Sequence, residues 1–341
     1  MRFYNRQHRH YCGVDLHVKT MYLCVLDATG QILVHRNVRA TPAAFLEAVA
    51  PYREDLVVAA ECMFTWYWLA DLCAAEGLTF VLGHALAMKA IHGGKAKNDK
   101  LDALKIAGLV RGGLLPQAYV YPPRMRGTRD LLRRRLHLVR KRGELHAHLA
   151  HTVQQYQLPD AGGNAAGPPR RDLDPSVQKS LAVDRALADQ YDPFIHDLER
   201  TIVRAARRHD AETFRRLRTV PGIGEILALT ILYEVHDITR FHRVQEFASY
   251  ARLVKGLKQS GGKTLGTSGA KMGNVYLKWA FSEAAVQFLR HTREGKPLLT
   301  ALQRKHGRGK ALSILAHKLG RAVFYIWARG TVFSMEKFLA A

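Results

Sequence analysis

The strongest constraint on the fold is a change of pattern at Pro122-Pro123. Before this point, short apolar runs at residues 56–60 and 78–82 alternate with segments of helical periodicity, such as residues 99–110. Strands that alternate with helices are typical of an α/β domain. We therefore predict an α/β domain over residues 1–123.

Turn and cap residues locate the first elements of this domain. The β-rich segments 11–27 and 31–38 flank the turn Asp27-Ala-Thr-Gly30, which predicts a hairpin. Thr41 and Pro42 form a helix start, because threonine caps a helix and proline fits its first turn. Residues 67–76 are predicted to be helical and to end at Gly77.

After Pro123 the sequence pattern predicts helices. Residues 124–157 and 181–206 have apolar stripes at helical spacing, and a linker at 158–176, rich in Gly, Ala and Pro, separates them. Two long helices around a flexible linker predict an antiparallel or intermolecular helical arm over 124–212. Residues 213–341 are predicted to form a compact helical domain.

The charge balance restricts the partners. The chain has 52 Lys and Arg against 29 Asp and Glu, a net charge of +23. Such a chain repels itself, and a polyanion with phosphate groups relieves the repulsion. A membrane surface is less favoured, because no long basic helix carries an apolar face rich in Trp and Phe.

The start of the chain lacks the apolar core of a signal peptide, and Glu61, Asp71 and Glu76 interrupt the apolar run at 56–81. We expect a reduced, cytoplasmic protein in which Cys62 and Cys73 fill cores.

The basic arm is a candidate nucleic-acid surface. Its cations are expected to bind phosphates and are Arg133, Arg134, Arg135, Arg140, Lys141 and Arg142. The alternative is a solvated helix face that contributes little.

Four carboxylates form a candidate metal site. Asp15 lies inside an apolar strand, where a charge is costly unless it is paired or binds a metal, and Glu61 directly follows another buried strand. Asp99 and Asp102 are three residues apart, so they share one helix face and repel each other without a cation. Oxygen ligands of this kind suit Mg²⁺ or Mn²⁺. Taken singly, Asp15 is equally compatible with a capped or turn-paired strand residue, and Asp99 and Asp102 are equally compatible with a solvated helix start.

The segment Gln259-Ser260-Gly261-Gly262-Lys263-Thr264 resembles the end of a phosphate-binding P-loop. The spacing fails, because five residues rather than four separate Gly256 from Gly262. We predict instead a flexible loop in which Ser260 lies among Lys258, Lys263 and Lys271, a setting that suits a phosphate. A plain surface serine is the alternative.

Pro221-Gly222-Ile223-Gly224 is predicted to be a tight turn between two helices, of the helix-hairpin-helix type. The amides of Gly222 and Gly224 would contact phosphates without reading base sequence. A plain helical turn is the alternative.

Taken in order, these motifs resemble the DEDD transposases of the IS110 insertion-sequence family, which are kin to the Piv DNA invertases. The resemblance rests on Gly13-Val-Asp-Leu-His17, Ala60-Glu61, Lys97-Asn-Asp-Lys-Leu-Asp-Ala103, Val220-Pro-Gly-Ile-Gly224 and Ser260-Gly261. It implies a ribonuclease-H-like (RuvC-like) domain, a coiled-coil arm and a helical transposase domain.

The resemblance also implies roles. Asp15, Glu61, Asp99 and Asp102 match the acidic tetrad, and Ser260 matches the nucleophile that becomes joined to DNA. Donor and target DNA, a bridge RNA and a tetramer of two dimers are the implied partners, with tetrad and serine supplied by different protomers. We therefore expect a recombinase that depends on serine and metal. The alternatives are a RuvC-like junction nuclease, in which water attacks, and a non-catalytic scaffold that binds nucleic acid.

Overall fold

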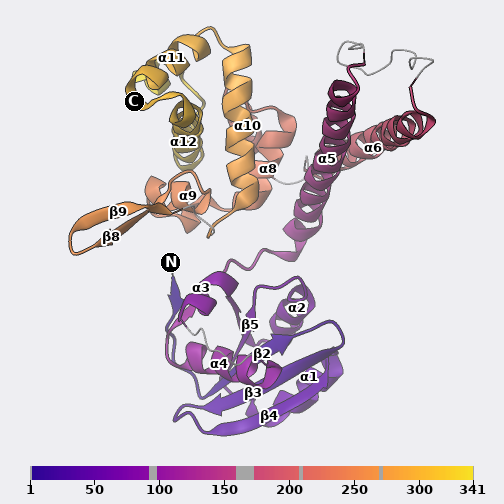
Figure 1. Ribbon diagram of the computed structural model, residues 1–341. Helices are drawn as coiled ribbons and strands as arrows, with labels where there is room; N and C mark the ends of the chain where they lie inside the picture. Colours follow the sequence, from indigo (N-terminus) through magenta and orange to yellow (C-terminus); the bar gives the residue numbers. More distant parts are fainter. Residues whose placement is uncertain (1, 92–97, 159–172, 207–209, 269–271, 341) are drawn as a thin grey trace. The chain divides into compact units, whose positions relative to one another are not determined.

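The computed structural model describes residues 2–91, 98–158, 173–206, 210–268 and 272–340 (Figure 1). The chain divides into two compact units, Met1–Arg124 and Met125–Ala341. Among the helices of the described residues, none is both long and apolar enough to cross a membrane.

Unit 1 is built on a mixed five-stranded sheet with the order β4-β3-β2-β5-β6. The strands β2, β3 and β4 form an antiparallel meander, and β5 and β6 continue the sheet parallel to β2. The described elements are β1 (Phe3–Tyr4), β2 (His10–Leu16), β3 (Thr20–Asp27), β4 (Ile32–Arg39), α1 (Pro42–Val49), a 3-10 turn (Ala50–Tyr52), β5 (Leu56–Glu61), α2 (Tyr67–Ala75), β6 (Thr79–Gly83), α3 (Ala85–Ile91), α4 (Asp99–Arg111) and β7 (Leu115–Pro116).

The predicted element boundaries are largely confirmed in this unit. The side chain of Thr41 caps α1, Gly77 follows α2 with a positive φ of 67°, and Asp27 closes the turn to β4. The segment 11–27 is two strands rather than one, because the chain reverses between Leu16 and Thr20 and the predicted hairpin is the second half of the meander.

Helices cover both faces of the sheet. One core joins β2 and β5 to α4, and a second core joins the opposite face of the same strands to α1 and α2. Cys73 lies in the second core, where burial raises the pKa of its thiol to about 12. Cys62 is exposed, contrary to expectation, because it lies just beyond the end of β5.

Unit 2 consists of two long helices and a helical body. Its described elements are α5 (Pro123–Gln155), α6 (Pro175–Ala206), α7 (Ala211–Leu217), α8 (Glu225–Val235), a 3-10 turn (Ile238–Arg240), α9 (Val244–Tyr250), β8 (Gly256–Ser260), β9 (Lys263–Ser268), α10 (Val275–His291), α11 (Gly295–His306), α12 (Arg308–Arg329) and α13 (Met335–Ala340). Most of the predicted linker 158–176 lies outside the described residues, and α6 begins before its end, at Pro175.

The two long helices pack antiparallel. Arg135 of α5 pairs with Glu199 of α6 at 2.6 Å, and Arg142 of α5 pairs with Asp192 of α6. Residue numbers therefore increase along α5 in the direction in which they decrease along α6. The arm expected from the sequence is therefore an intramolecular antiparallel pair.

A buried carboxylate fastens α5 to the helical body. Glu234, near the end of α8, is 1% exposed and accepts hydrogen bonds from Arg129 and Arg133 of α5 at 3.1 and 2.6 Å. The side-chain amide of Asn274, the residue before α10, donates a further hydrogen bond to it at 2.7 Å. The guanidinium of Arg133 also stacks on Tyr276, 4.3 Å from the ring centroid. We call these four residues, Arg129, Arg133, Glu234 and Asn274, the Glu234 cluster.

Candidate functional site

The sheet places Asp15 and Glu61 on neighbouring strands. The parallel register of β2 and β5 pairs Val14 with Ala60, so Asp15 and Glu61 are the next residues on the two strands. Side chains alternate along a strand, which directs both carboxylates to the face opposite Val14. That face is the one covered by α4, since α4 shares its core with Tyr11 and Ala59.

A glycine allows α4 to approach this face closely. A Cβ atom at Gly13 would lie 2.2 Å from the carbonyl oxygen of Ala103 and 2.4 Å from the amide nitrogen of Ala107, so only glycine fits there. The close packing of β2 on α4 brings the start of α4 beside Asp15. Gly13 thus positions Asp15 against the helix that carries the other two acids.

The start of α4 is well defined. The Asn98 side chain caps the helix by accepting a hydrogen bond from the Leu101 amide at 2.8 Å. Asp99 and Asp102 follow in the first turn, where the helix dipole stabilises negative charge.

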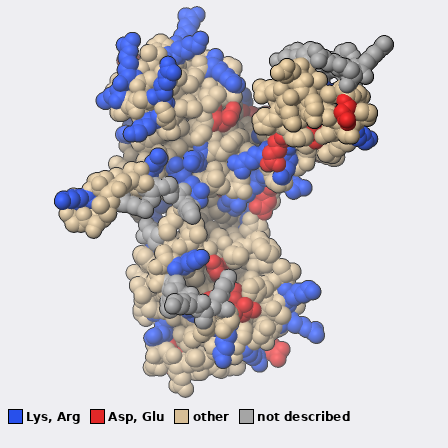
Figure 2. All heavy atoms as spheres, in the orientation of Figure 1, with Lys and Arg blue, Asp and Glu red and all other residues tan. Residues whose placement is uncertain are grey.

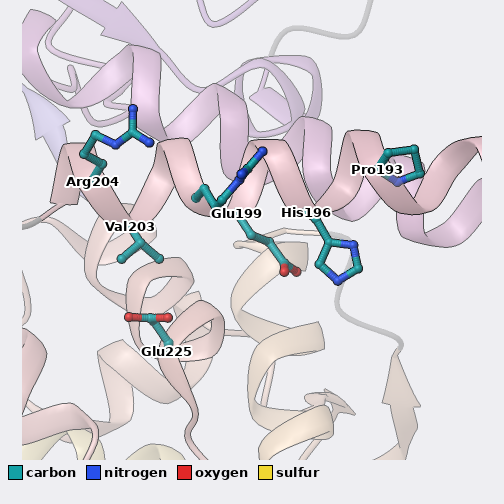
Figure 3. Close-up of a pocket in the computed structure, with 7 residues that line it drawn as sticks. Pro193, His196, Glu199, Val203, Arg204 and Glu225 are labelled. Carbon is teal, nitrogen blue, oxygen red and sulfur yellow. The ribbon is translucent and has the colours of Figure 1, made fainter.

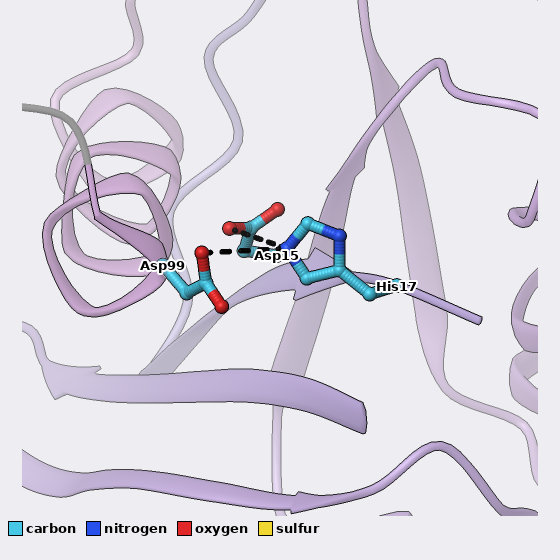
Figure 4. A group of neighbouring side chains, drawn as sticks. All are labelled: Asp15, His17 and Asp99. Carbon is cyan, nitrogen blue, oxygen red and sulfur yellow. Dashed lines mark ion pairs between the residues drawn. The ribbon is translucent and has the colours of Figure 1, made fainter. Parts of the chain in front are cut away.

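Three side chains meet at this point (Figure 4). His17 Nε2 lies 3.4 Å from a carboxylate oxygen of Asp15 and 3.5 Å from one of Asp99, so the imidazole bridges the two acids. The Asp15 side chain is 15% exposed, whereas His17 and Asp99 are about half-exposed. A ligand atom from each of the three lies within 4.8 Å of the others.

The electrostatics of Asp15 indicate a place for a cation. Burial raises the pKa of Asp15; His17 lowers it, and the charges of Asp99 and Asp102 raise it further. The net effect is a raised pKa, because ionised Asp15 is poorly solvated and faces two other acids. Two carboxylates and an imidazole at such separations suit a divalent cation, which would remove this repulsion.

Asp102 and Glu61 are placed differently. Asp102 forms an ion pair with Lys105 at 3.3 Å, and Glu61 is partly buried at the end of β5. Both are described, and neither belongs to the group within 4.8 Å. The sequence reasoning missed His17 as part of the site, although it lies only two residues after Asp15, just beyond the end of β2.

Ser260 lies at the tip of a β-hairpin, not in the flexible loop predicted from the sequence. The strands β8 and β9 pair Ser260 with Lys263, and Gly261 and Gly262 have φ values of 55° and 74°. Two adjacent positive φ values are those of a type I′ turn, which Gly-Gly adopts without strain. Ser260 and Lys263 are exposed; the side chain of Lys258 and all of Lys271 lie outside the described residues.

The two glycines of the 221–224 turn have different surroundings. Gly222 has a φ of +87°, and a Cβ there would lie 2.4 Å from the Ala284 oxygen and 2.6 Å from the Phe288 nitrogen of α10. Gly222 therefore permits close packing of the turn on α10. Gly224 precedes α8 and has space for a Cβ atom. Phosphate binding by these amides stays a prediction.

Most of the predicted arm cations have intramolecular partners. Arg133 belongs to the Glu234 cluster, Arg135 and Arg142 bind acids of α6, and Lys141 pairs with Glu144. Arg134 and Arg140 are exposed, and within the described residues no ion pair joins either to an acid. Phosphate binding by the arm stays a prediction, and these two arginines are the cations that it would use first.

An open groove of about 670 Å³ lies between α6 and the start of α8 (Figure 3). Its lining includes His196, Glu199 and Arg204 of α6 and Glu225 of α8. None of the predicted catalytic residues lines it.

Known proteins resemble the chain along most of its length. A family model for DEDD transposases matches residues 12–158, and the model described as the transposase IS116/IS110/IS902 family matches residues 214–299. The transposase for insertion sequence element IS1111A of Coxiella burnetii is 26% identical over 93% of this chain and 89% of its own length. The transposase for insertion sequence element IS1328 of Yersinia enterocolitica is 29% identical over 39% of this chain and 42% of its own.

Proposed function

Because the chain belongs to the IS110 family of insertion-sequence transposases, we propose that this DNA transposase cuts and rejoins DNA through the Ser260 hydroxyl. In this proposal Asp15, Glu61, Asp99 and Asp102 hold Mg²⁺ or Mn²⁺ beside the scissile phosphate. The observation that carries the proposal is the meeting of Asp15 and Asp99 at the start of α4, with the raised pKa of Asp15.

The donor set fits a divalent cation. Burial and the charges of Asp99 and Asp102 disfavour the ionised form of Asp15, and a bound cation would offset both effects. The order of the sheet, an antiparallel meander continued by two parallel strands, supports the ribonuclease-H-like assignment. When bound, the cation would polarise the phosphate and favour deprotonation of a nearby hydroxyl.

The proposed transfer exchanges one phosphodiester bond for another. The Ser260 oxygen attacks phosphorus and loses its proton, the bond to the deoxyribose 3′ oxygen breaks, and that oxygen leaves as a hydroxyl. A 5′-phosphoserine link then holds the DNA end. Attack by a 3′-hydroxyl of another strand reverses these steps and frees the serine, so rejoining requires no ATP.

The hairpin supports the role of Ser260. The two-residue turn holds the hydroxyl at an exposed tip between paired strands, where a DNA backbone can reach it. The neighbouring Lys263 offers a positive charge to the phosphate. Asp15 belongs to unit 1 and Ser260 to unit 2, and the proposal requires that both act on one phosphate, within one protomer or between two.

The family resemblance extends the proposal to a bridge RNA and a tetramer. The net charge of +23 supports binding of more than one nucleic acid. Val183, Leu187 and Phe194 of α6 are 44%, 48% and 59% exposed and are spaced by four and seven residues, which supports association of arms as a coiled coil. Light scattering of the purified protein and sequencing of its copurifying RNA test these two points.

A junction nuclease is the second candidate. Asp15, His17 and Asp99 gather within unit 1 without the serine, and such a site can serve water as the nucleophile.

The experiment uses supercoiled DNA with the element ends, Mg²⁺ and the full-length protein. We expect a covalent protein–DNA adduct in the wild type and none with Ser260→Ala or Asp15→Asn. Thr264→Ala, which removes a hydroxyl from the same exposed hairpin, is the matched control and should retain the adduct. If Ser260→Ala still cleaved and left free 5′-phosphates, water would be the nucleophile and the nuclease reading would replace the proposal.

A further inference from the structure

Two groups of cations lie at the two ends of α11. One group precedes and opens the helix, and the other surrounds the turn from α11 to α12. We call these seven residues the α11 basic surface: Arg290, Arg293, Lys296, Arg304, Lys305, Arg308 and Lys310. All seven are exposed.

This charge has little local compensation. Glu294 is the one acidic residue between Phe288 and Leu312. In the described part of the chain, no ion pair links any residue of the α11 basic surface to an acid, in contrast to Arg135 and Arg142 of the arm. Figure 2 shows Lys and Arg gathered over the part of unit 2 that carries α11.

The next turns of α12 carry further basic side chains, among them Lys318 and Arg321. Burial lowers the pKa of Lys318, and the neighbouring Arg321 lowers it further. Burial and Arg321 also lower the pKa of His317. Burial is the larger cause of both shifts, and the repulsion from Arg321 that adds to it is one that an anionic partner would offset.

The form of the surface favours a polyanion. The 12 residues of α11 span about 18 Å, so the two groups are too far apart to hold one small phosphorylated ligand. A lipid surface fits poorly, because Leu298 and Leu302 of α11 pack against the core of unit 2 and leave no apolar face for a membrane.

We propose that the α11 basic surface binds the phosphodiester backbone of a nucleic acid without reading its base sequence. The inference rests on the proposed function in that the chain acts on nucleic acid, but it involves neither the metal site nor Ser260. Four of its cations, Arg304, Lys305, Arg308 and Lys310, lie beyond residues 214–299, the part of unit 2 that the second family model matches.

The test compares two variants of equal net charge. The first replaces Arg304, Lys305, Arg308 and Lys310 with glutamine. The control replaces four exposed arginines that already pair with acids, namely Arg9, Arg53, Arg200 and Arg243. Each variant loses four positive charges, so a general effect of net charge would appear equally in both.

Binding is measured by fluorescence anisotropy at several salt concentrations, with a duplex DNA of arbitrary sequence and with a structured RNA. Each lost duplex contact removes about 0.9 from the slope of log affinity against log salt, so the first variant should lose about three to four. We expect its affinity to fall at least about tenfold at 0.15 M salt, and that of the control by less than about twofold.

The two nucleic acids identify the source of the phosphates. A loss on duplex alone assigns the surface to DNA, a loss on RNA alone assigns it to RNA, and either supports the inference. Equal behaviour of the two variants on both nucleic acids would overturn it. Adduct formation at Ser260 is scored separately: wild-type binding through this surface without any adduct would refute the proposed function and leave this inference standing.

Discussion

Replacing Glu234 with glutamine tests whether the Glu234 cluster holds α5 on the helical body. The carboxylate is 1% exposed and accepts hydrogen bonds from Arg129, Arg133 and Asn274. Glutamine keeps the shape of the side chain, but it removes the negative charge. Its amide also places an N–H group where the carboxylate oxygen had accepted a hydrogen bond, facing another N–H donor of the cluster. Two arginines, of which Arg129 is almost fully buried, then lose the counter-charge of Glu234.

The loss of the Glu234 charge sets the decrease in the free energy of unfolding. Removal of one partner from a buried ion pair destabilises a protein by about 3–5 kcal/mol. Because Arg133 is 30% exposed and water can still solvate it, we expect the lower end, about 3 kcal/mol. For a unit of this size, that corresponds to a melting temperature lower by roughly 6–12 °C.

The pH dependence gives an independent readout. Burial raises the pKa of Glu234, but the hydrogen bond and charge of Arg133, with Arg129 and Asn274, outweigh burial and hold the pKa below its usual value. A carboxyl with a depressed pKa stabilises the fold above its unfolded pKa and loses this contribution as pH falls through the folded value. The difference between wild type and Glu234→Gln should therefore be largest near neutral pH and shrink in acid.

Calorimetry of the full-length protein between neutral and acidic pH measures both effects. The matched control is Glu212→Gln, which breaks an exposed pair with Arg216 and should cost less than about 0.5 kcal/mol. If both variants melted alike, or if the difference from wild type did not shrink in acid, the cluster would not stabilise the body as argued.

Three further predictions concern the turn, the metal site and the arm. Gly222→Ala should lower the melting temperature strongly, because its Cβ would meet the backbone of α10, whereas Gly224→Ala, at the N-cap of α8 with space for a Cβ, should lower it only slightly; equal melts would contradict the close packing of Gly222 on α10. Asp15→Asn should abolish Mn²⁺ binding in calorimetric titration without lowering the melting temperature of the metal-free protein, because it removes a like charge from the cluster; Mn²⁺ binding at wild-type strength would exclude Asp15 as a ligand. Neutralising Arg134 and Arg140 together should reduce the salt dependence of DNA binding more than neutralising two ion-paired arginines of the arm, and an equal effect would argue against the distinction between them.

The sequence predicted those parts of the fold that local signals define. The Thr41 cap, the Asp27 turn and the stop at Gly77 are each set by residues within a few positions of the element they bound. The tetrad residues Asp15 and Asp99 could be selected because a charge in an apolar strand and a pair of acids on one helix face are both costly without a partner.

Features that depend on distant contacts could not be predicted. Arg129 and Glu234 are 105 residues apart, and nothing local marks them as partners. The hairpin that carries Ser260 has exposed Leu257 and Leu265, so it lacks the one-sided apolar alternation by which a strand is recognised. The Gly-Gly turn was the one available signal. The close packing of Gly222 on α10, which requires a glycine at this position, could likewise not be predicted from the sequence.

The Glu234 cluster also limits how this part of the chain can change over evolutionary time. Its members come from α5, from α8 and from the residue before α10, and a substitution at any one of them leaves a buried charge or amide without its partner. A set of related sequences should therefore either retain all four residues or replace them together by apolar ones. Correlated substitution of Arg129, Arg133 and Glu234 would be the record of that dependence, and intermediates that retain the arginines without the acid should be rare.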